Sequence, residues 1–510
     1  MLEDCEMITD NATSIFSSAR RFFSGTMLSR VAGMGRDMMM AFAFGASPPV
    51  AAFMVAFRLA HLLRRVFGEG ALQSAFIPHF EELRHENPQR AKDFFRDLSF
   101  TITLLLVGVI LAALALCGAT LIFVDLSAGN REIIQLVMLM LPSLLFICLY
   151  GLNASLLQCE GKYFLSSAAP IAFNILWIGG AYFLRNMPVA EAMSYLSIVI
   201  IISCLAQWLA TVPTAFSLLK SCSLQFSISA DVKALIKPIS LGIIGIAATQ
   251  LNTAMDAIFA RYADPEGPAL LWYAIRLQQL PIALFGIALS GALLPPLSRA
   301  AKSGQHEKFC HFLHFGIEKT VVLMIPITIA IFLLGERAIN LLYGRGDFTE
   351  NAVVNTYWCL AGYGIGILPM SLILLLAPAY YGQGNYQTPM RASVIGVLTN
   401  LLLNSVMIMF MGLGAASVAL ATSLSAFVNL AILWRGLHDV ALSPIIAPVA
   451  KSLAASITGV LLTLIAFNFQ SANVHSFTEQ LTAFLYPSVL FMTPILYLWF
   501  SEAKAIAARS

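Results

Sequence analysis

The chain of 510 residues is 59% hydrophobic and only 11% charged, and its formal net charge is +3. Soluble domains carry about 25% charged residues, so this composition excludes a soluble enzyme and predicts an all-α polytopic membrane protein. At about 20 residues per spanning helix, the chain has room for about 14 transmembrane helices and for no soluble catalytic domain. We therefore expect neither an enzyme nor a nucleic-acid-binding protein. The scattered cysteines form no C-x-x-C pair, so neither a disulfide framework nor a zinc site is expected.

Apolar segments long enough to cross a bilayer recur along the whole chain. Their positions predict spanning helices at residues 17–44, 50–83, 97–124, 133–157, 164–184, 190–218, 234–261, 269–297, 312–342, 352–381, 390–411, 414–436, 446–469 and 480–500. Lysine and arginine gather in alternate loops between these segments, on the same side as both ends of the chain. The positive-inside rule then predicts that both termini are cytoplasmic.

A weak internal repeat divides the predicted helices into two groups. Residues 161–170 form a Gly turn that opens one helix and leads to Asn174, and residues 384–389 open another and lead to Asn400. The two turns are six predicted helices apart, which is typical of transporters built from two similar lobes. We therefore expect a cytoplasmic tail, two six-helix lobes and an additional pair of C-terminal helices, at residues 1–16, 17–222, 223–440 and 441–510.

The first predicted hairpin, residues 27–80, contains charges that its apolar length does not explain. An arginine at the middle of a bilayer costs roughly 2.5–3.5 kcal/mol, so these side chains are expected to face water, one another or a ligand. Arginines outnumber carboxylates in the hairpin, which predicts a cavity for an anion inside the membrane. The charged residues concerned are Arg30, Arg36, Asp37, Arg58, Arg64, Arg65 and Glu69.

Arg30, Arg36 and Arg64 are the candidate anion-binding residues. Neither Arg36 nor Arg64 has an acidic residue three or four positions away, so neither has an obvious local partner. Guanidinium groups of this kind suit bidentate binding of phosphate. The structural alternative is that these side chains reach the membrane surface or pair with another helix.

The other charges of the hairpin are candidates for pairing inside the cavity. On a continuous helix at 50–83, Arg58, Arg65 and Glu69 would share one face, and Arg65 and Glu69 would form an i, i+4 ion pair. Arg30 and Asp37 are seven positions apart and share a face of the preceding helix.

Further along the chain, Arg276 and Asp256 lie in neighbouring predicted helices. Either the two side chains form an ion pair, or Arg276 lines the anion cavity. Asn400 and Asn404 share a helix face, so Asp256, Asn400 and Asn404 form a candidate site for a monovalent cation, sodium or a proton. Ordinary hydrogen bonding between helices is the alternative for these three residues. No other cofactor is expected.

Several stretches in the same order along the chain resemble the MurJ (MviN) family of lipid II flippases, which belongs to the multidrug/oligosaccharidyl-lipid/polysaccharide exporter superfamily. In the first hairpin they are S-R-V-x-G-x-x-R-D at 29–37 and V-A-F-x-L-x-x-L-L-R-R-x-F-x-E-G-A at 55–71. Further along they are W-Y-A-x-R-L with G-I-A-L-x-x-x-L-L-P-x-L-S at 272–298, Y-G-x-G-x-F-T at 343–349 and A-P-x-Y-Y at 377–381. The resemblance implies 14 helices, with the two lobes arranged in a V. It assigns the diphosphate of the substrate to Arg30, Arg36, Arg64 and Arg276. Ala51 and Ile275 stand where the family often has an acid, which makes the cavity more positive.

The resemblance implies a bacterial inner-membrane protein that moves the undecaprenyl-diphosphate-linked peptidoglycan precursor from the cytoplasmic to the periplasmic leaflet by alternating access. Lipid II and membrane lipids would be its partners, with the cell-wall synthesis machinery as a further candidate, and residues 441–510 would line a groove for the lipid tail. The alternatives are a drug/cation antiporter, another exporter of lipid-linked oligosaccharides, or a non-transporting scaffold. An antiporter would need carboxylates in its cavity, so the excess of arginine disfavours it.

Overall fold

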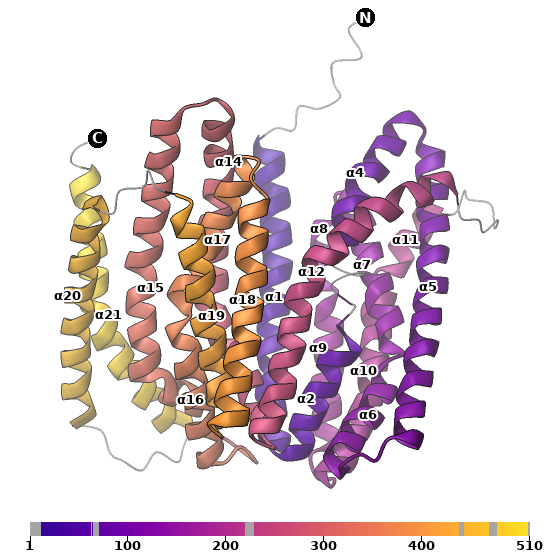
Figure 1. The fold of residues 1–510 in the computed structure, drawn as a ribbon, viewed down its shortest axis with the longest axis horizontal. Coiled ribbons are helices and arrows are strands. Elements are labelled where there is room, and N and C mark those ends of the chain that lie inside the picture. Colours follow the sequence, from indigo (N-terminus) through magenta and orange to yellow (C-terminus); the bar gives the residue numbers. More distant parts are fainter. Residues whose placement is uncertain are drawn as a thin grey trace, which may run out of the picture. The chain divides into compact units, whose positions relative to one another are not determined.

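The computed structural model describes residues 12–62, 64, 71–219, 229–437, 443–468 and 477–507. Helices joined by turns and short irregular segments make up these residues, and no strand occurs within the described ranges. The contacts divide the chain into two compact units (Figure 1). The first unit comprises Met1–Phe44 and Ala52–Ala254, and the second comprises Gly45–Ala51 and Met255–Ser510. The lobe boundaries at 17–222 and 223–440 remain predictions.

Helix α1 lies at the centre of the contacts that matter for the site in the first unit. It packs along α8 and α9, and α10 packs against α7 and α9. The helices that contribute to this unit are α1 (Ala12–Phe44), α2 (Pro48–Ala60), α4 (Ala71–Glu86), α5 (Pro88–Phe123), α6 (Ala128–Met140), α7 (Ser143–Cys159), α8 (Tyr163–Ala168), α9 (Pro170–Leu184), α10 (Val189–Leu209), α11 (Val212–Leu219) and most of α12 (Ala230–Ala263).

The second unit is built around α15, which contacts α14, α16, α17, α20 and α21. Leucine and tyrosine side chains of α14, α15, α17 and α19 form a buried apolar core that includes Leu293, Leu313, Leu376, Tyr380 and Leu433. The remaining helices are α13 (Gly267–Pro281), η1 (Ile282–Ile287), α14 (Ala288–Lys302), α15 (His306–Tyr343), α16 (Glu350–Ile365), α17 (Ile367–Gly382), α18 (Gln387–Ser405), η2 (Val406–Phe410), α19 (Ala416–Arg435), α20 (Ser443–Asn468) and α21 (Phe477–Ala507).

The described helices identify a multi-pass membrane protein. Nine of them are long and apolar enough to cross a membrane, and the number rises to 11 if each of two bent helix pairs counts as one span. Large apolar side chains stand on the outside, such as Phe123, Phe183 and Phe410, with 83%, 82% and 84% of their surface exposed. Such exposure suits contact with lipid. The number of 14 spans stays a prediction.

The predicted continuous helix at 50–83 is wrong. Helix α2 ends at Ala60, and His61 and Leu62 form a turn in which Leu62 N donates to Leu59 O and Arg64 N donates to His61 O. The bonds span three residues instead of four, which tightens the chain and ends the regular helix. Irregular backbone at membrane depth is tolerated where it lines a polar cavity, and this turn lies among charged side chains. Arg58 lies in the last turn of α2, before this turn, and the other two residues of the predicted face, Arg65 and Glu69, lie outside the described residues.

Two further predicted helices are bent instead of straight. The segment predicted at 133–157 divides into α6 and α7 with a bend of 46°, and the segment predicted at 352–381 divides into α16 and α17 with a bend of 40°. Pro142 stands at the first break. Gly366 stands at the second, where a Cβ atom would lie 2.5 Å from Ser423 Oγ. The close approach of α19 thus requires glycine at this bend.

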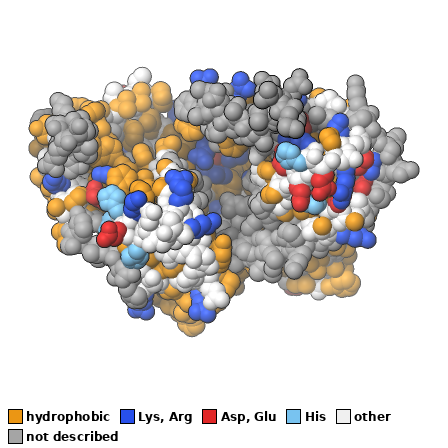
Figure 2. Space-filling view, turned by 90° about the horizontal axis from the view of Figure 1, so that it is seen from above, with side chains coloured by type: hydrophobic (Ala, Val, Ile, Leu, Met, Phe, Trp, Pro, Cys, Tyr) orange, Lys and Arg blue, Asp and Glu red, His pale blue; other side chains and the backbone are white. Residues whose placement is uncertain are grey.

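Charged side chains of the first unit gather at one end of α4 and α5. Figure 2 shows acidic, basic and histidine side chains together over this end. Asn87 caps α5 by accepting from Gln89 N and Arg90 N, and Pro88 follows it at the first helical position, so α5 begins well before the predicted residue 97.

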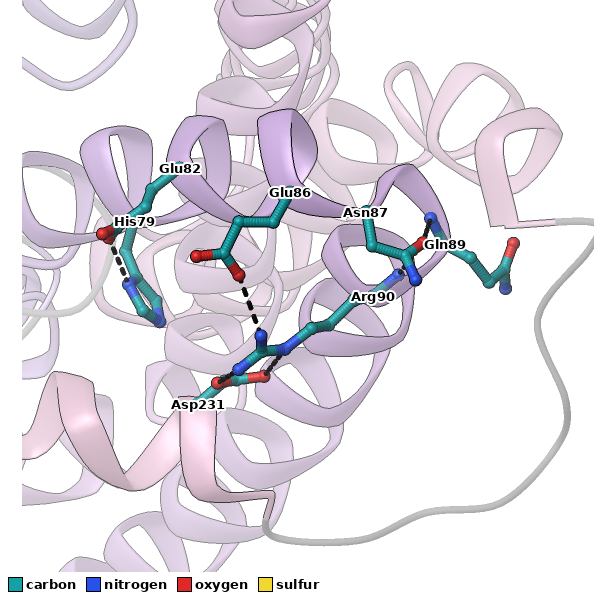
Figure 3. Close-up of polar contacts among 7 residues, drawn as sticks. All are labelled: His79, Glu82, Glu86, Asn87, Gln89, Arg90 and Asp231. Carbon is teal, nitrogen blue, oxygen red and sulfur yellow. Dashed lines mark hydrogen bonds and ion pairs between the residues drawn. The ribbon is translucent and has the colours of Figure 1, made fainter.

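The same charged end fixes the start of the long helix α12. Arg90 Nε and Nη2 donate to the two oxygens of Asp231 at 3.0 and 2.7 Å, and Arg90 Nη1 donates to Glu86 at 2.9 Å (Figure 3). This bidentate pair ties α12, the helix that leads into the second unit, to the start of α5.

Candidate functional site

Arg36, the first candidate anion-binding arginine, is buried on α1 beside Asp37. Its Nε and Nη2 donate to Asp37 Oδ1 at 3.0 and 2.8 Å, and its Nη1 donates to Asn174 Oδ1 at 3.2 Å. The prediction that Arg36 lacks a local acidic partner is therefore wrong. Asp37 is adjacent in sequence and points elsewhere on an ideal helical wheel, but the length of the arginine lets its guanidinium fold back to the carboxylate.

Helix α9 holds the guanidinium from the other side. Asn174 Nδ2 donates to Ser29 O at 3.3 Å, so this one amide contacts both the backbone of α1 and the side chain of Arg36. The Arg36 guanidinium lies over the Trp177 ring, 4.7 Å from its centroid. Trp177 is completely buried and makes edge contacts with Phe53 and Phe57 of α2. These contacts fix the position and orientation of one arginine in the first unit.

Arg36 and Arg64 meet at one cavity, which we call the arginine cavity. It encloses about 110 Å³ and is lined by Arg36, His61, Arg64, Asn174 and Gln207, together with Cys204 and apolar residues. No carboxylate is among the described residues that line it. The structure thus brings together two of the arginines that the sequence singled out. Donors prevail among the polar groups of the lining, which suits an anion.

His61 is a cavity residue that sequence reasoning missed. It is buried, its Nδ1 lies 3.0 Å from Phe57 O, and its Nε2 lies 3.1 Å from Ser143 Oγ. These contacts connect the turn after α2 to the start of α7. A signal was present in the sequence, because His61 precedes Arg64 by three positions, the spacing of one helical turn.

Arg30 lines a second cavity of the first unit, which we call the amide cavity. It encloses about 230 Å³, and its polar lining comprises Thr26, Ser29, Arg30, Gln73, Tyr150, Gln158, Ser166 and Ser167. Gln73 Nε2 donates to Gln158 Oε1 at 2.8 Å, which joins α4 to α7. Pro170, at the start of α9, lines both cavities, so they adjoin there.

The second unit contains the predicted group of Asp256, Asn400 and Asn404. Asn404 Nδ2 donates to Asp256 Oδ1 and to Asn400 Oδ1, both at 3.0 Å. Thr422, which the sequence analysis did not include, donates to Asp256 Oδ2 at 3.3 Å and accepts from Asn400 Nδ2 at 3.2 Å. The residues come from α12, α18 and α19, and Asp256, Asn400 and Asn404 are buried. The structure therefore places the three predicted residues in one polar network of oxygen-bearing side chains.

The remaining predicted site residues lie as follows. Arg276, on α13, holds its guanidinium over the Trp272 ring, 4.4 Å from the centroid. Arg58 is half-buried in the last turn of α2. Arg65 and Glu69, with the ion pair expected between them, lie outside the described residues. The cation–π contact holds the Arg276 guanidinium against an aromatic ring within the second unit.

Comparisons of the sequence with known proteins identify one family. A family profile described as lipid II flippase MurJ matches residues 40–491. A protein of Chlamydia trachomatis named "Probable lipid II flippase MurJ" is 35% identical over 431 residues, which cover 84% of this chain and 79% of that protein. A protein of the same name from Vibrio cholerae is 31% identical over 443 residues and covers 81% of each chain.

Solved structures show the same fold at lower identity. A structure described as "Lipid II flippase MurJ, inward closed conformation" superposes with a TM-score of 0.76 at 22% identity, covering 94% of this chain and 99% of that one. An inward-facing multidrug transporter of the MATE family superposes with a TM-score of 0.65 at 14% identity, covering 84% of this chain and 98% of that one. Both similarities concern the fold alone.

Proposed function

Since this chain belongs to the lipid II flippase MurJ family, we propose that it carries lipid II, the undecaprenyl-diphosphate-linked peptidoglycan precursor, across the bacterial inner membrane. Transport would run from the cytoplasmic to the periplasmic leaflet by alternating access of two lobes. The family consists of transporters, so we propose no enzymatic activity for this chain. The role belongs to peptidoglycan synthesis and therefore to cell-wall growth and cell shape.

The arginine cavity is the single observation that carries this proposal. A diphosphate is an anion with oxygens arranged for bidentate contacts, and arginine is the side chain that best matches it. Arg36 and Arg64 line the same small cavity, and the contacts of Arg36 with Asp37, Asn174 and Trp177 hold its guanidinium in one orientation. Preorganisation of this kind reduces the cost of ordering the site on binding. Arg30 in the adjoining cavity and Arg276 in the second unit would contact the same diphosphate during transport.

Drug/cation antiport is the less well supported alternative. It would require carboxylates in the cavity, and the described lining of the arginine cavity supplies arginine, histidine and amide groups instead. The similarity to the multidrug transporter concerns the fold alone. Export of another lipid-linked oligosaccharide shares the diphosphate and would use the same arginines.

We propose a coupling role for the polar network of the second unit. Asp256, Asn400, Asn404 and Thr422 supply carboxylate, amide and hydroxyl oxygens, which are the ligands that hard cations prefer. A sodium ion or a proton at Asp256 would compensate a buried carboxylate and would favour whichever conformation binds it more tightly.

The proposal also assigns the side of the membrane on which the termini lie and a path for the lipid tail. We place both termini in the cytoplasm because of the distribution of lysine and arginine between the spans. Helices α20 and α21 pack against each other and expose apolar side chains such as Ile457, Leu461 and Val489. These two helices would line the path of the polyprenyl tail. The cell-wall synthesis machinery is the expected consumer of the flipped precursor.

Rescue of a bacterium depleted of its own lipid II flippase tests the function. Expression of this chain should restore growth and cell shape, and Arg64→Ala at equal membrane abundance should not. Arg84→Ala is the matched control, since Arg84 pairs with Glu81 and Glu160 and lines neither cavity. Failure of the wild-type chain to restore growth at normal abundance would contradict the proposal.

A further inference from the structure

The amide cavity differs in chemistry from the arginine cavity that it adjoins. Its polar lining consists of two carboxamides, several hydroxyl groups and one guanidinium, so it presents both donors and acceptors. The arginine cavity presents mainly donors. A purely anionic group needs only donors, whereas amides and hydroxyl groups need partners of both kinds. The difference predicts different ligand groups for the two cavities.

Hydrogen bonds inside the lining leave acceptor oxygens on its serine side chains. Ser166 Oγ and Ser167 Oγ each donate to Tyr163 O at 2.9 Å, so their protons are directed to the backbone of α8. Their oxygens can then accept from an N–H or O–H group of a ligand. The hydrogen bond between Gln73 and Gln158 uses one donor and one acceptor of the several that two carboxamides provide.

The position and the size of the amide cavity suit one part of a large substrate. Arg30 and Arg36 are six residues apart on α1, which is about 9 Å along the helix axis at 1.5 Å per residue. The volume of about 230 Å³ is below the ~300–1,000 Å³ of sites that enclose a whole small molecule. A ligand group here would therefore be continuous with a diphosphate held at Arg36 and Arg64.

We infer that the amide cavity binds one part of the sugar–peptide head of lipid II next to the diphosphate and so selects substrates that carry this head. The inference rests on the proposed function. The head offers amide N–H, carbonyl and hydroxyl groups, which match the carboxamides of Gln73 and Gln158 and the serine oxygens. The polyprenyl tail is excluded, because an apolar chain would leave these polar groups without hydrogen bonds. Gln73 and Gln158 are specificity residues in this assignment, and Arg36 and Arg64 bind the diphosphate common to all carriers.

Two lipid probes separate the roles of the cavities. We compare the binding of lipid II and of undecaprenyl diphosphate, which lacks the head, to the purified full-length chain in detergent. The variant Gln73→Leu/Gln158→Leu removes both carboxamides at similar volume, and simultaneous replacement avoids leaving one half-buried amide without its partner. Gln89→Leu, at an exposed position of α5 outside both cavities, is the matched control.

The double variant should bind lipid II about tenfold more weakly, as expected for the loss of one or two hydrogen bonds. Its affinity for undecaprenyl diphosphate should stay at the wild-type value. Arg64→Ala should weaken the binding of both probes, and Gln89→Leu should change neither. An equal loss for both probes, or an unchanged affinity for lipid II, would overturn the inference.

Two further measurements test whether the variants fold and whether the proposed function, on which this inference rests, is correct. If the double variant shows no cooperative thermal unfolding, Gln73→Asn and Gln158→Asn replace it, because they retain the amide and shorten its reach, and the same outcomes decide. If the wild-type chain binds both probes and the variants do not weaken the binding of lipid II selectively, this inference alone is overturned. Failure of the wild-type chain to bind either probe overturns the proposed function and this inference together.

Discussion

Arg36 and Asp37 are neighbours in sequence and form a buried ion pair, with Arg36 Nη2 2.8 Å from Asp37 Oδ1. Only 8% of Arg36 and 2% of Asp37 is exposed. Removal of one partner from a buried pair leaves an uncompensated charge, which costs about 3–5 kcal/mol. Asp37 thus allows a cationic side chain to remain inside the first unit before any substrate arrives.

Asp37→Asn should therefore destabilise the protein by about 3 kcal/mol, because the amide cannot neutralise the guanidinium. Thermal unfolding of the purified protein in detergent measures the effect. Asp125→Asn, at an exposed position after α5, should leave the unfolding temperature unchanged. Equal unfolding temperatures for Asp37→Asn and the wild type would show that the pair does not stabilise the fold.

Arg64→Ala should abolish rescue of flippase-depleted cells with little loss of protein from the membrane. Loss of a charge-assisted contact to the diphosphate costs about 1.5–3 kcal/mol, or roughly 10–150-fold in binding. Arg64→Lys should rescue poorly, because an ammonium group lacks the planar fork of the guanidinium. Full activity of Arg64→Ala in a quantitative growth assay is the outcome that rules out this role.

The wild type should respond to sodium or to pH, and Asp256→Asn should remove this response. Single cysteines on the walls of the cavities are labelled in sodium and in potassium buffers, at two pH values. A shift of about 1.4 kcal/mol in the conformational equilibrium changes the labelling ratio tenfold. Thr422→Val, which loses the hydroxyl that contacts Asp256, should weaken the response. If neither sodium nor pH changes the wild-type pattern, the network has a structural role only.

Arg90 and Asp231 should hold the start of α12 against α5. Arg90→Asp and Asp231→Arg each place like charges together and should lower the unfolding temperature, and the double swap should restore part of the loss. The effect of each single variant should decrease at high salt, because Arg90 is solvent-exposed. A double swap that is no more stable than the worse single variant would disprove the pairing.

Arg65 and Glu69 are expected to pair, and charge reversal tests this prediction directly. Either single reversal should lower membrane abundance, since it places two like charges close together. The double reversal should recover part of the abundance, measured by immunoblotting of membrane fractions. A double reversal that is no more abundant than the worse single variant would contradict the pairing.

The sequence was sufficient to predict an all-helical, multi-pass membrane protein. Long apolar segments recur throughout the chain, and the lack of water in a bilayer leaves helices as the way to satisfy their backbone groups. It also singled out the arginines as candidates for a site, because a charge inside such a segment costs free energy wherever the helix packs. The motifs around Arg36 and Arg64 led to the family that the comparisons then identified.

Tertiary structure decided which of these charges meet and which helices bend. Sequence spacing suggested that Arg36 had no partner, but the pairing with Asp37 and the contact with Asn174 depend on how α9 packs against α1. The turn at His61 replaced a predicted straight helix, because a local change in hydrogen bonding is not visible in an apolar periodicity. The meeting of Gln73 and Gln158, 85 positions apart, depends on the packing of α4 against α7. Residue composition determines that polar groups need partners, whereas only the folded chain determines which partners come within hydrogen-bonding distance.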